Sequence, residues 1–398
     1  MGLPDVIVVG AGVLGAAVAY ESARRGLRVV VLERAATPAA GATRCSMAGL
    51  TWLSATDDGV RRLSLEGLAR HRTLGDELDA DTGYRPVPML LVAADAADLA
   101  PVDPLLTAGR AAGFRADRVG PDELLRLEPS LAPGAAAAGV RCEQGQVDPE
   151  RLTRAWLGAA TRLGARVRYG ADVRAVAAGG AAVETGAGRL AGGRVVVAAG
   201  AWSRRLLAGA GVDLPAVATH AEILETSPQP PALTHFVAEA SDARAELETA
   251  MADPAFAPRW TGPATDTAEL LPAAVQLCVA QFGDGRIRLG QVSRAVPGFL
   301  PGPLPGGEAL LRERAARYFP RLAGVPATLR ARSVAISADK LPLAGPLAHA
   351  PDVFVVTAMD SPLIFAPAIA VRLAAALAGE PTPDLDPFRP DRVIAPPG

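Results

Sequence analysis

A glycine-rich turn near the start of the chain constrains the fold more than any other feature. Gly10, Gly12 and Gly15 follow the apolar run Val6–Val9 and precede an alanine-rich segment at Ala16–Arg25. This pattern predicts a buried strand, a tight turn and a helix. In such a turn the first glycine permits the bend, the second lets a ligand approach the backbone, and the third lets the helix pack closely on the strand. The sequence therefore predicts a Rossmann-type nucleotide-binding turn.

A second apolar run, Arg28–Leu32, completes a βαβ unit and ends at an acidic residue, Glu33. An acid at this position can accept hydrogen bonds from the hydroxyls of an adenosine ribose and would repel a 2′-phosphate. NADP is therefore disfavoured, whereas FAD and NAD both remain. Val13 and Leu14 lie where the helix begins, and its free N–H groups and positive potential suit a pyrophosphate.

Composition argues against several other classes of protein. The chain has 398 residues, of which 50% are hydrophobic and 21% charged, as expected of a globular protein. The formal net charge of -2 gives no electrostatic support for nucleic-acid binding. Three cysteines without paired spacing and four histidines without ligand spacing predict neither a disulfide framework nor a metal site. We expect a cytoplasmic protein without a transmembrane segment, and the sequence leaves oligomerisation open.

The remaining pattern predicts an α/β fold: a Rossmann-type domain interleaved with an α+β domain built on a mostly antiparallel sheet. The acidic stretch 239–271 is expected as an insertion that covers an edge or mouth of that sheet. The elements expected outside it are helices at 60–78, 152–163 and 367–377, buried-sheet strands about Val167 and at 173–176, 194–199 and 353–357, and alternating strands at 223–225, 275–281 and 286–290.

Several segments, taken in order, resemble the D-amino-acid oxidase superfamily of FAD enzymes, in particular members similar to glycine oxidase, sarcosine oxidase and the flavin subunits of opine and proline dehydrogenases. The similarity spans most of the chain. The segments that carry it are 6–34, 41–52 (GATRCSMAGLTW), 147–149, 195–206 (VVVAAGAWSRRL), 338–345 (ADKLPLAG) and 386–392.

The resemblance implies FAD as the cofactor and an interleaved domain arrangement. The FAD-binding domain would comprise residues 1–85, 140–215 and 331–398, and the substrate domain residues 86–139 and 216–330. The residues that would contact FAD, besides Gly10, Gly12, Val13, Leu14 and Gly15, are Glu33, Arg34, Ala42, Thr43, Arg44, Met47, Ala48, Gly49, Val173, Ala199, Gly200, Trp202, Met359, Asp360, Ser361, Pro362 and Leu363.

The sequence departs from this family near the expected substrate. Members place an arginine before the aspartate that matches Asp339, where it pairs with a substrate carboxylate, but this chain has Val334 there. Arg332 would project from the same face of a regular strand and could substitute for it. Lys340 stands where the family has glycine, and Pro362 has no N–H to donate in the loop at the flavin pyrimidine edge.

The candidate catalytic residues are Asp360, Lys340, Arg332 and Arg44. Asp360 could hold a substrate amine, although a solvated loop aspartate is an equally good interpretation. Lys340 could bind an acid group or activate oxygen, and a surface charge is the simpler alternative. His220 and Glu222 could also face the substrate, but an exposed edge pair is the simpler interpretation.

The predicted function is oxidation of the C–N bond of an amine or amino acid to an imine, with hydride transfer to FAD and reoxidation by oxygen or a partner protein. The alternatives are oxidation of a hydroxy acid or a modified biosynthetic intermediate, and a flavin-carrying subunit without catalysis.

Overall fold

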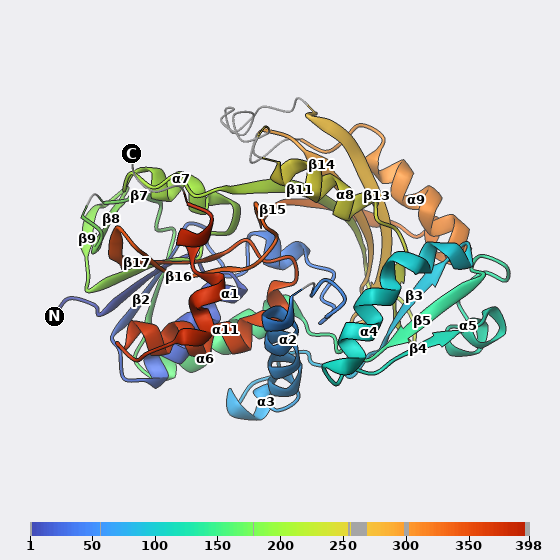
Figure 1. Ribbon diagram of the computed structural model, residues 1–398, viewed down its shortest axis with the longest axis horizontal. Coiled ribbons are helices and arrows are strands. Elements are labelled where there is room, and N and C mark those ends of the chain that lie inside the picture. Colours follow the sequence, from blue (N-terminus) through green and yellow to red (C-terminus); the bar gives the residue numbers. More distant parts are fainter. Residues whose placement is uncertain are drawn as a thin grey trace.

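The computed structural model describes residues 2–55, 57–177, 179–253, 255, 269–297 and 302–394. Within these residues, one sheet has six strands, and strands from distant parts of the chain lie side by side in it (Figure 1). Their spatial order is β16 (Leu343–Leu347), β17 (Ala350–Thr357), β10 (Arg194–Val197), β1 (Val6–Val9), β2 (Val29–Glu33) and β6 (Arg166–Tyr169).

The central strands of this sheet are parallel: β1 pairs with β2 and β10, β10 with β17, and β2 with β6, whereas β16 is antiparallel to β17. The apolar β-branched runs form the buried strands, as expected for a sheet covered on both faces. Three helices, which are α1 (Val13–Arg24), α6 (Pro149–Arg162) and α11 (Pro362–Leu377), pack together on one face (Figure 1).

A second sheet has eight described strands and is antiparallel except where β12 meets β3, which confirms the predicted antiparallel platform. Their order is β15 (Ala327–Ser337), β11 (Ala216–Thr226), β14 (Ile287–Ala295), β13 (Leu271–Gln281), β12 (Phe236–Glu239), β3 (Met89–Ala93), β5 (Ala138–Cys142) and β4 (Ala116–Val119).

Several helices pack against this larger sheet, and two of them lie on β13 and β14. The first, α9 (Gly307–Tyr318), buries Leu311 and Ala315 in an apolar cluster with β11, β13 and β14. The second, α8 (Ala243–Ala252), packs Leu247 and Met251 on β13 and β14. It forms the described part of the expected insertion, and residues 254 and 256–268 lie outside the described residues.

The structure has further helices, strands and 3-10 turns. They are α2 (Asp58–His71), α3 (Leu74–Glu77), α4 (Asp103–Ala111), α5 (Pro121–Leu127), α7 (Ser203–Ala208), α10 (Pro320–Ala323), the strands β7 (Val173–Val176), β8 (Ala182–Thr185) and β9 (Gly188–Ala191), and the 3-10 turns η1 (Ala42–Cys45), η2 (Ala96–Val102), η3 (Gly200–Trp202), η5 (Pro383–Phe388) and η6 (Pro390–Arg392). Among the described residues no helix has both the length and the apolarity needed to cross a membrane.

Some expected elements are wrong in detail. The strand at Val173–Val176 belongs to a separate three-stranded antiparallel sheet with β8 and β9, and β6 is a largely exposed edge strand, so neither is buried as expected. The expected helix 60–78 is divided between α2 and α3. Helix α11 begins at Pro362 rather than Pro367, because proline is well accommodated in the first turn of a helix.

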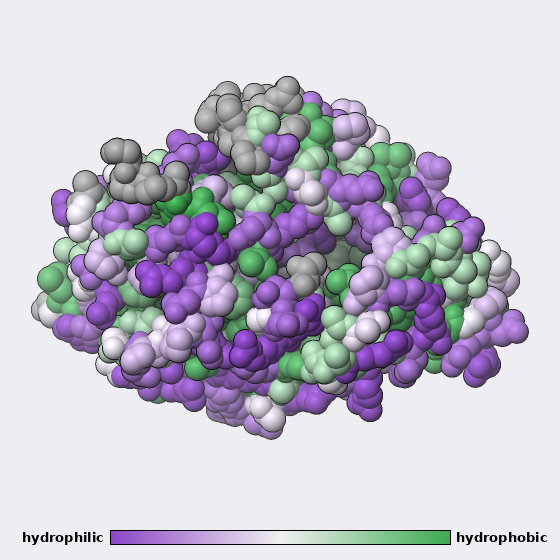
Figure 2. Space-filling model, viewed as in Figure 1, coloured by the Kyte–Doolittle hydropathy of each residue, from purple (hydrophilic) through white to green (hydrophobic). Residues whose placement is uncertain are grey.

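The two sheets lie on either side of the middle of the molecule (Figure 1), and the mostly hydrophilic surface in Figure 2 is hollowed near its centre. Strand β15 runs without interruption across residue 331, where the sequence places a domain boundary. The division into domains otherwise stays a prediction.

Candidate cofactor and substrate site

The glycine turn lies between β1 and α1, and its backbone geometry explains two of its glycines. Gly10 has a φ of +107°, and a Cβ atom there would lie 2.5 Å from the carbonyl oxygen of Ala198. A Cβ atom on Gly15 would lie 2.0 Å from the carbonyl oxygen of Gly10. Both positions therefore exclude any side chain, since real Cβ contacts are much longer.

The outer side of the turn is open to a ligand. A Cβ atom on Gly12 would come near only Thr43, whose Oγ1 would be 3.3 Å away. Gly12 is the N-cap of α1 and has no side chain of its own to cap the helix, and the first turn of α1 carries no acidic residue. Val13 N donates to Thr43 Oγ1 at 3.2 Å, which brings two predicted cofactor residues together. A helix start of this kind suits a pyrophosphate, because free N–H groups and the helix dipole favour an anion.

Glu33 is fixed at the end of β2 by two backbone groups. Its Oε2 accepts from Ala11 N and its Oε1 from Ala35 N, both at 2.8 Å. The carboxylate therefore lies beside the glycine turn, where the sequence predicts it. The next residue, Arg34, stacks on the Trp202 ring with 4.3 Å from guanidinium carbon to ring centroid, so two more predicted residues meet.

Further predicted residues gather at the carboxyl ends of β10 and β17. Gly200 and Trp202 form η3 directly after β10, and Thr357 Oγ1 donates to Gly200 O at 3.1 Å. Val173 and Ala199 pack at the margin of an apolar cluster that β10 and β17 help to form. Ligands of doubly wound sheets bind in this kind of crevice, outside the carboxyl ends of parallel strands.

The segment from Ala42 to Gly49 passes beneath the larger sheet. A Cβ atom on Gly290 of β14 would lie 3.3 Å from Met47 Sδ, and one on Gly49 would lie 3.1 Å from a ring carbon of Phe236 in β12. Between them, Ala48 has a left-handed φ of +69° and its N–H donates to Ser46 Oγ. The predicted ring-lining loop therefore lies between the two sheets.

The loop from Met359 to Leu363 joins β17 to α11 beside this segment. Met359 is buried, Ser361 Oγ is 3.1 Å from Ser54 Oγ, and Pro362 opens α11. The carbonyl oxygen of Leu363 is 2.8 Å from Nε2 of the buried His71. Burial lowers the pKa of His71 to about 4, so this imidazole is neutral.

Asp360 and Lys340 both contact α8, which sequence reasoning did not connect with the site. Asp360 Oδ1 forms an ion pair with Arg244, whose Nε donates to Glu248 Oε1 at 2.7 Å. Lys340 has a left-handed φ of +62°, as the family's glycine would, and its Nζ donates to Ala245 O at 2.9 Å. No sequence signal identified Arg244, because its partner in the other half of the molecule is far away in the chain.

Arg332 and Arg44 lie at the loop around η1. The register of β15 against β11 is unbroken, so Arg332 and Val334 share a face. Arg332 Nε donates to Ala40 O at 3.1 Å, and Arg44 Nε lies 3.3 Å from Glu150 Oε1. Arg44 is therefore engaged by α6, whereas Arg332 joins the larger sheet to the segment before η1.

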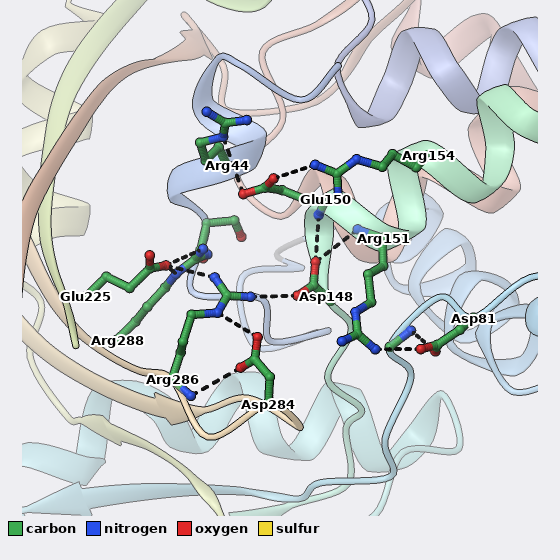
Figure 3. A network of polar contacts seen from close by, with 12 residues as sticks. Arg44, Asp81, Asp148, Glu150, Arg151, Arg154, Glu225, Asp284, Arg286 and Arg288 are labelled. Carbon is green, nitrogen blue, oxygen red and sulfur yellow. Dashed lines mark hydrogen bonds and ion pairs between the residues drawn. The ribbon is translucent and has the colours of Figure 1, made fainter. Parts of the chain in front are cut away.

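A partly buried network of arginines and carboxylates also escaped sequence reasoning (Figure 3). Glu225 of β11 pairs with Arg286 at 3.2 Å and with Arg288 and Arg330 at 2.7 Å. Burial raises the pKa of Glu225, but the three arginines outweigh burial and hold it below the ordinary value. Arg288 Nη1 also donates to Ser46 O, so this one arginine supports the ring-lining loop.

His220 and Glu222 are not an exposed edge pair. Strand β11 lies inside the sheet, His220 is 3% exposed, and Glu222 is fully buried and pairs with Arg294 at 3.2 Å. Burial, aided by Arg294 and Arg332, lowers the pKa of His220 to about 4. Within the described ranges, no group of three or more His, Cys, Asp or Glu residues could hold a metal ion.

The residues of the turn therefore fit a dinucleotide: an open glycine backbone, a helix start with glycine at its N-cap and a carboxylate fixed beside them. Gly12, Val13 and Thr43 would hold the pyrophosphate, and Glu33 the adenosine ribose.

Comparisons with known proteins identify the family of the chain. Residues 5–376 match the family model described as DAO, FAD dependent oxidoreductase. The chain is 31% identical over 219 residues to glycine oxidase of Geobacillus kaustophilus (strain HTA426), a match that covers 53% of this chain and 58% of that protein. The chain thus spans somewhat more than half the length of this curated relative.

Solved structures share the whole fold. The crystal structure of glycine oxidase from Geobacillus kaustophilus has a TM-score of 0.82 at 23% identity and covers 100% of both chains. That of L-proline dehydrogenase from P. horikoshii has a TM-score of 0.80 at 18% identity, covering 98% of this chain and 97% of that one. With the glycine turn, the fixed Glu33 and a family match across nearly the entire sequence, the chain belongs to the DAO family of FAD-dependent oxidoreductases.

Proposed function

We propose that this protein oxidises the C–N bond of an amine or amino acid to an imine. Bound FAD supplies the hydride acceptor, N5 of its ring. The relatives named glycine oxidase and L-proline dehydrogenase support a substrate that carries an amine.

The position of Asp360 carries this proposal. Its carboxylate lies in the loop between β17 and α11, 30% of its side chain is exposed, and only Oδ1 is paired with Arg244. The second oxygen can accept a hydrogen bond from an amine nitrogen brought between the two sheets. Asp360 would thus fix the nitrogen and orient the adjacent C–H bond.

Arg244 would set the strength of this contact. An isolated carboxylate favours a protonated amine, whereas oxidation needs the nitrogen lone pair to stabilise the developing cation. Because Arg244 already shares the charge of Asp360, the amine can be held without being kept protonated. Glu248 fixes Arg244 from α8, and Lys340 holds the same helix through Ala245 O.

The proposal extends to the cellular compartment and to the electron acceptor. Cys45, Cys142 and Cys278 are free thiols, which supports a reducing cytoplasm. Oxygen or a partner protein would reoxidise the flavin.

The experiment is anaerobic titration of the purified holoenzyme, followed by flavin absorbance. The panel pairs each amine or amino acid with the hydroxy compound of the same carbon skeleton, such as alanine with lactate. Reduction of the flavin by members of the amine set alone is expected. Reduction by hydroxy acids alone would contradict the proposal, and reduction by neither set would favour a non-catalytic flavin subunit.

A variant tests the role of Asp360. Asp360→Asn keeps the hydrogen bond to Arg244 but loses the charge, and we expect kcat/KM for the best amine to fall about tenfold or more. Asp384→Asn is the matched control, because Asp384 is a surface residue paired with Arg372 at 3.4 Å. If Asp360→Asn and Asp384→Asn have the same kcat/KM, Asp360 does not contact the substrate.

A further inference from the structure

Arg332 is a partly buried cation without a carboxylate partner. Its Nε donates to Ala40 O at 3.1 Å and its Nη1 to Ala331 O at 2.6 Å, and no ion pair involves it among the described residues. Backbone carbonyls are neutral, so they satisfy hydrogen bonds without balancing the charge. A partly buried guanidinium left unbalanced is unfavourable unless an anion binds beside it.

The arginines near Arg332 each form an ion pair with a carboxylate, and Arg332 differs from them in this respect. Arg330, two residues earlier on the same face of β15, pairs with Glu225 at 2.7 Å, as does Arg288. Arg286 pairs with Asp148 at 2.9 Å and Asp284 at 2.7 Å (Figure 3). Four arginines therefore face three carboxylates, and the excess positive charge lies at Arg332.

Arg332 contacts the segment that closes onto the glycine turn. Ala40, whose carbonyl it binds, follows Ala39, and Ala39 N donates to Ala11 O at 2.9 Å within the turn itself. Three residues later, Thr43 Oγ1 accepts from Val13 N at the start of α1. The turn has no basic side chain between Gly10 and Gly15, and Arg44, the nearest cation in the segment, is paired with Glu150.

We propose that Arg332 supplies the counter-charge for the pyrophosphate of the bound dinucleotide. The negative charge at the glycine turn would balance the guanidinium of Arg332, for which the described residues supply no carboxylate. Arginine suits this task because it stays charged and offers several N–H donors to phosphate oxygens. FAD would then tie the larger sheet to the Rossmann turn. The proposal concerns cofactor retention and does not depend on the substrate.

The test compares FAD retention by three purified holoproteins, Arg332→Gln, Arg332→Lys and Arg330→Gln, with the wild type. Flavin fluorescence released on dilution gives the dissociation constant at low and high salt. We expect Arg332→Gln to weaken FAD binding about tenfold and to flatten its salt dependence, the effect of losing one charge-assisted contact. Arg332→Lys should retain most of the affinity. Arg330→Gln should match the wild type, since its charge is already paired.

Phosphorus NMR of the bound cofactor provides a readout that a structural role would not move. The pyrophosphate resonances should shift in both Arg332 variants and stay in place in Arg330→Gln. If Arg332→Gln does not fold, the comparison can still be made with Arg332→Lys. A second arm measures the flavin absorbance change caused by acetate, a carboxylate probe. Weaker acetate binding in Arg332→Gln, with FAD retention and phosphorus resonances unchanged, would overturn the proposal and assign Arg332 to a substrate carboxylate. Failure of amine oxidation would alter none of these readouts.

Discussion

Gly15 shows how one missing Cβ atom permits the cofactor turn. Gly15→Ala would place that atom 2.0 Å from the carbonyl oxygen of Gly10, a backbone group that cannot move aside. We expect a loss of about 3 kcal/mol in the free energy of unfolding and loss of bound flavin. Urea unfolding and flavin content measure the two effects.

The matched control for this variant is Gly158→Ala in α6. A Cβ atom there would have its nearest neighbour, Arg162 Nη1, 3.7 Å away. Alanine favours helix more than glycine, so this variant should be stabilised by up to about 1 kcal/mol. Normal flavin content in Gly15→Ala would show that the turn does not hold the cofactor.

Residues whose role is set by local geometry could be predicted from the sequence. Gly10, Gly15 and Glu33 lie in one short βαβ unit, so their spacing in the chain fixes their positions in space. Arg244 could not be found this way, because its ion pair with Asp360 joins residues brought together only by the packing of α8 between the sheets. Side-chain partners of this kind depend on tertiary structure.

Helix α6 begins at a residue that serves both halves of the molecule. Asp148 caps this helix by accepting from Glu150 N and Arg151 N at 2.9 Å, and its second oxygen pairs with Arg286 of the larger sheet. Asp148→Ala should cost about 2 kcal/mol of unfolding free energy, because a cap and an ion pair are lost together. Asp148→Asn keeps a capping oxygen and should cost less.

Asp57→Ala is the comparison for the cap alone. Asp57 caps α2 by accepting from Gly59 N and Val60 N. We expect about 1 kcal/mol for this variant in the same urea titration. If Asp57→Ala lowers the free energy of unfolding as much as Asp148→Ala does, the pairing of Asp148 with Arg286 contributes nothing to stability.

At the level of elements, the sequence predicted strongly patterned segments best. The apolar runs of β1, β2 and β10 and parts of the alternating strands β11, β13 and β14 were found because burial dictates their pattern. Strand β7 was assigned to the wrong sheet, since a short run does not reveal its partner. The break between α2 and α3 was missed because the residues within it, Arg72 and Thr73, are neither proline nor glycine.

The whole molecule should lose stability in mild acid. Burial lowers the pKa of His71 and of His220 to about 4, against an ordinary value of 6.5. Between these values the unfolded chain binds more protons than the folded one, so stability is complete above pH 6.5 and falls as the pH drops towards 4. The loss amounts to several kcal/mol if both imidazoles stay neutral in the fold.

Thermal or urea unfolding across this pH range measures the effect. His71→Gln keeps a hydrogen-bond donor for Leu363 O but cannot titrate, so its stability should fall less steeply with acid. The variant His349→Gln is the control, because this histidine lies on the turn between β16 and β17, outside the core. If the stability of His71→Gln falls with pH as steeply as that of the wild type, the buried His71 does not cause the loss of stability in acid.

The six-stranded sheet gathers distant stretches of the chain, and neither hydropathy nor spacing alone revealed which strands are neighbours. Only the family resemblance limited the choice. The central claim is that this assembled turn binds FAD. The most direct measurement is the visible absorption spectrum of the purified protein, with the flavin quantified per chain. We predict a flavin spectrum at nearly stoichiometric content in the wild type, whereas a colourless protein that takes up no added FAD would contradict the account.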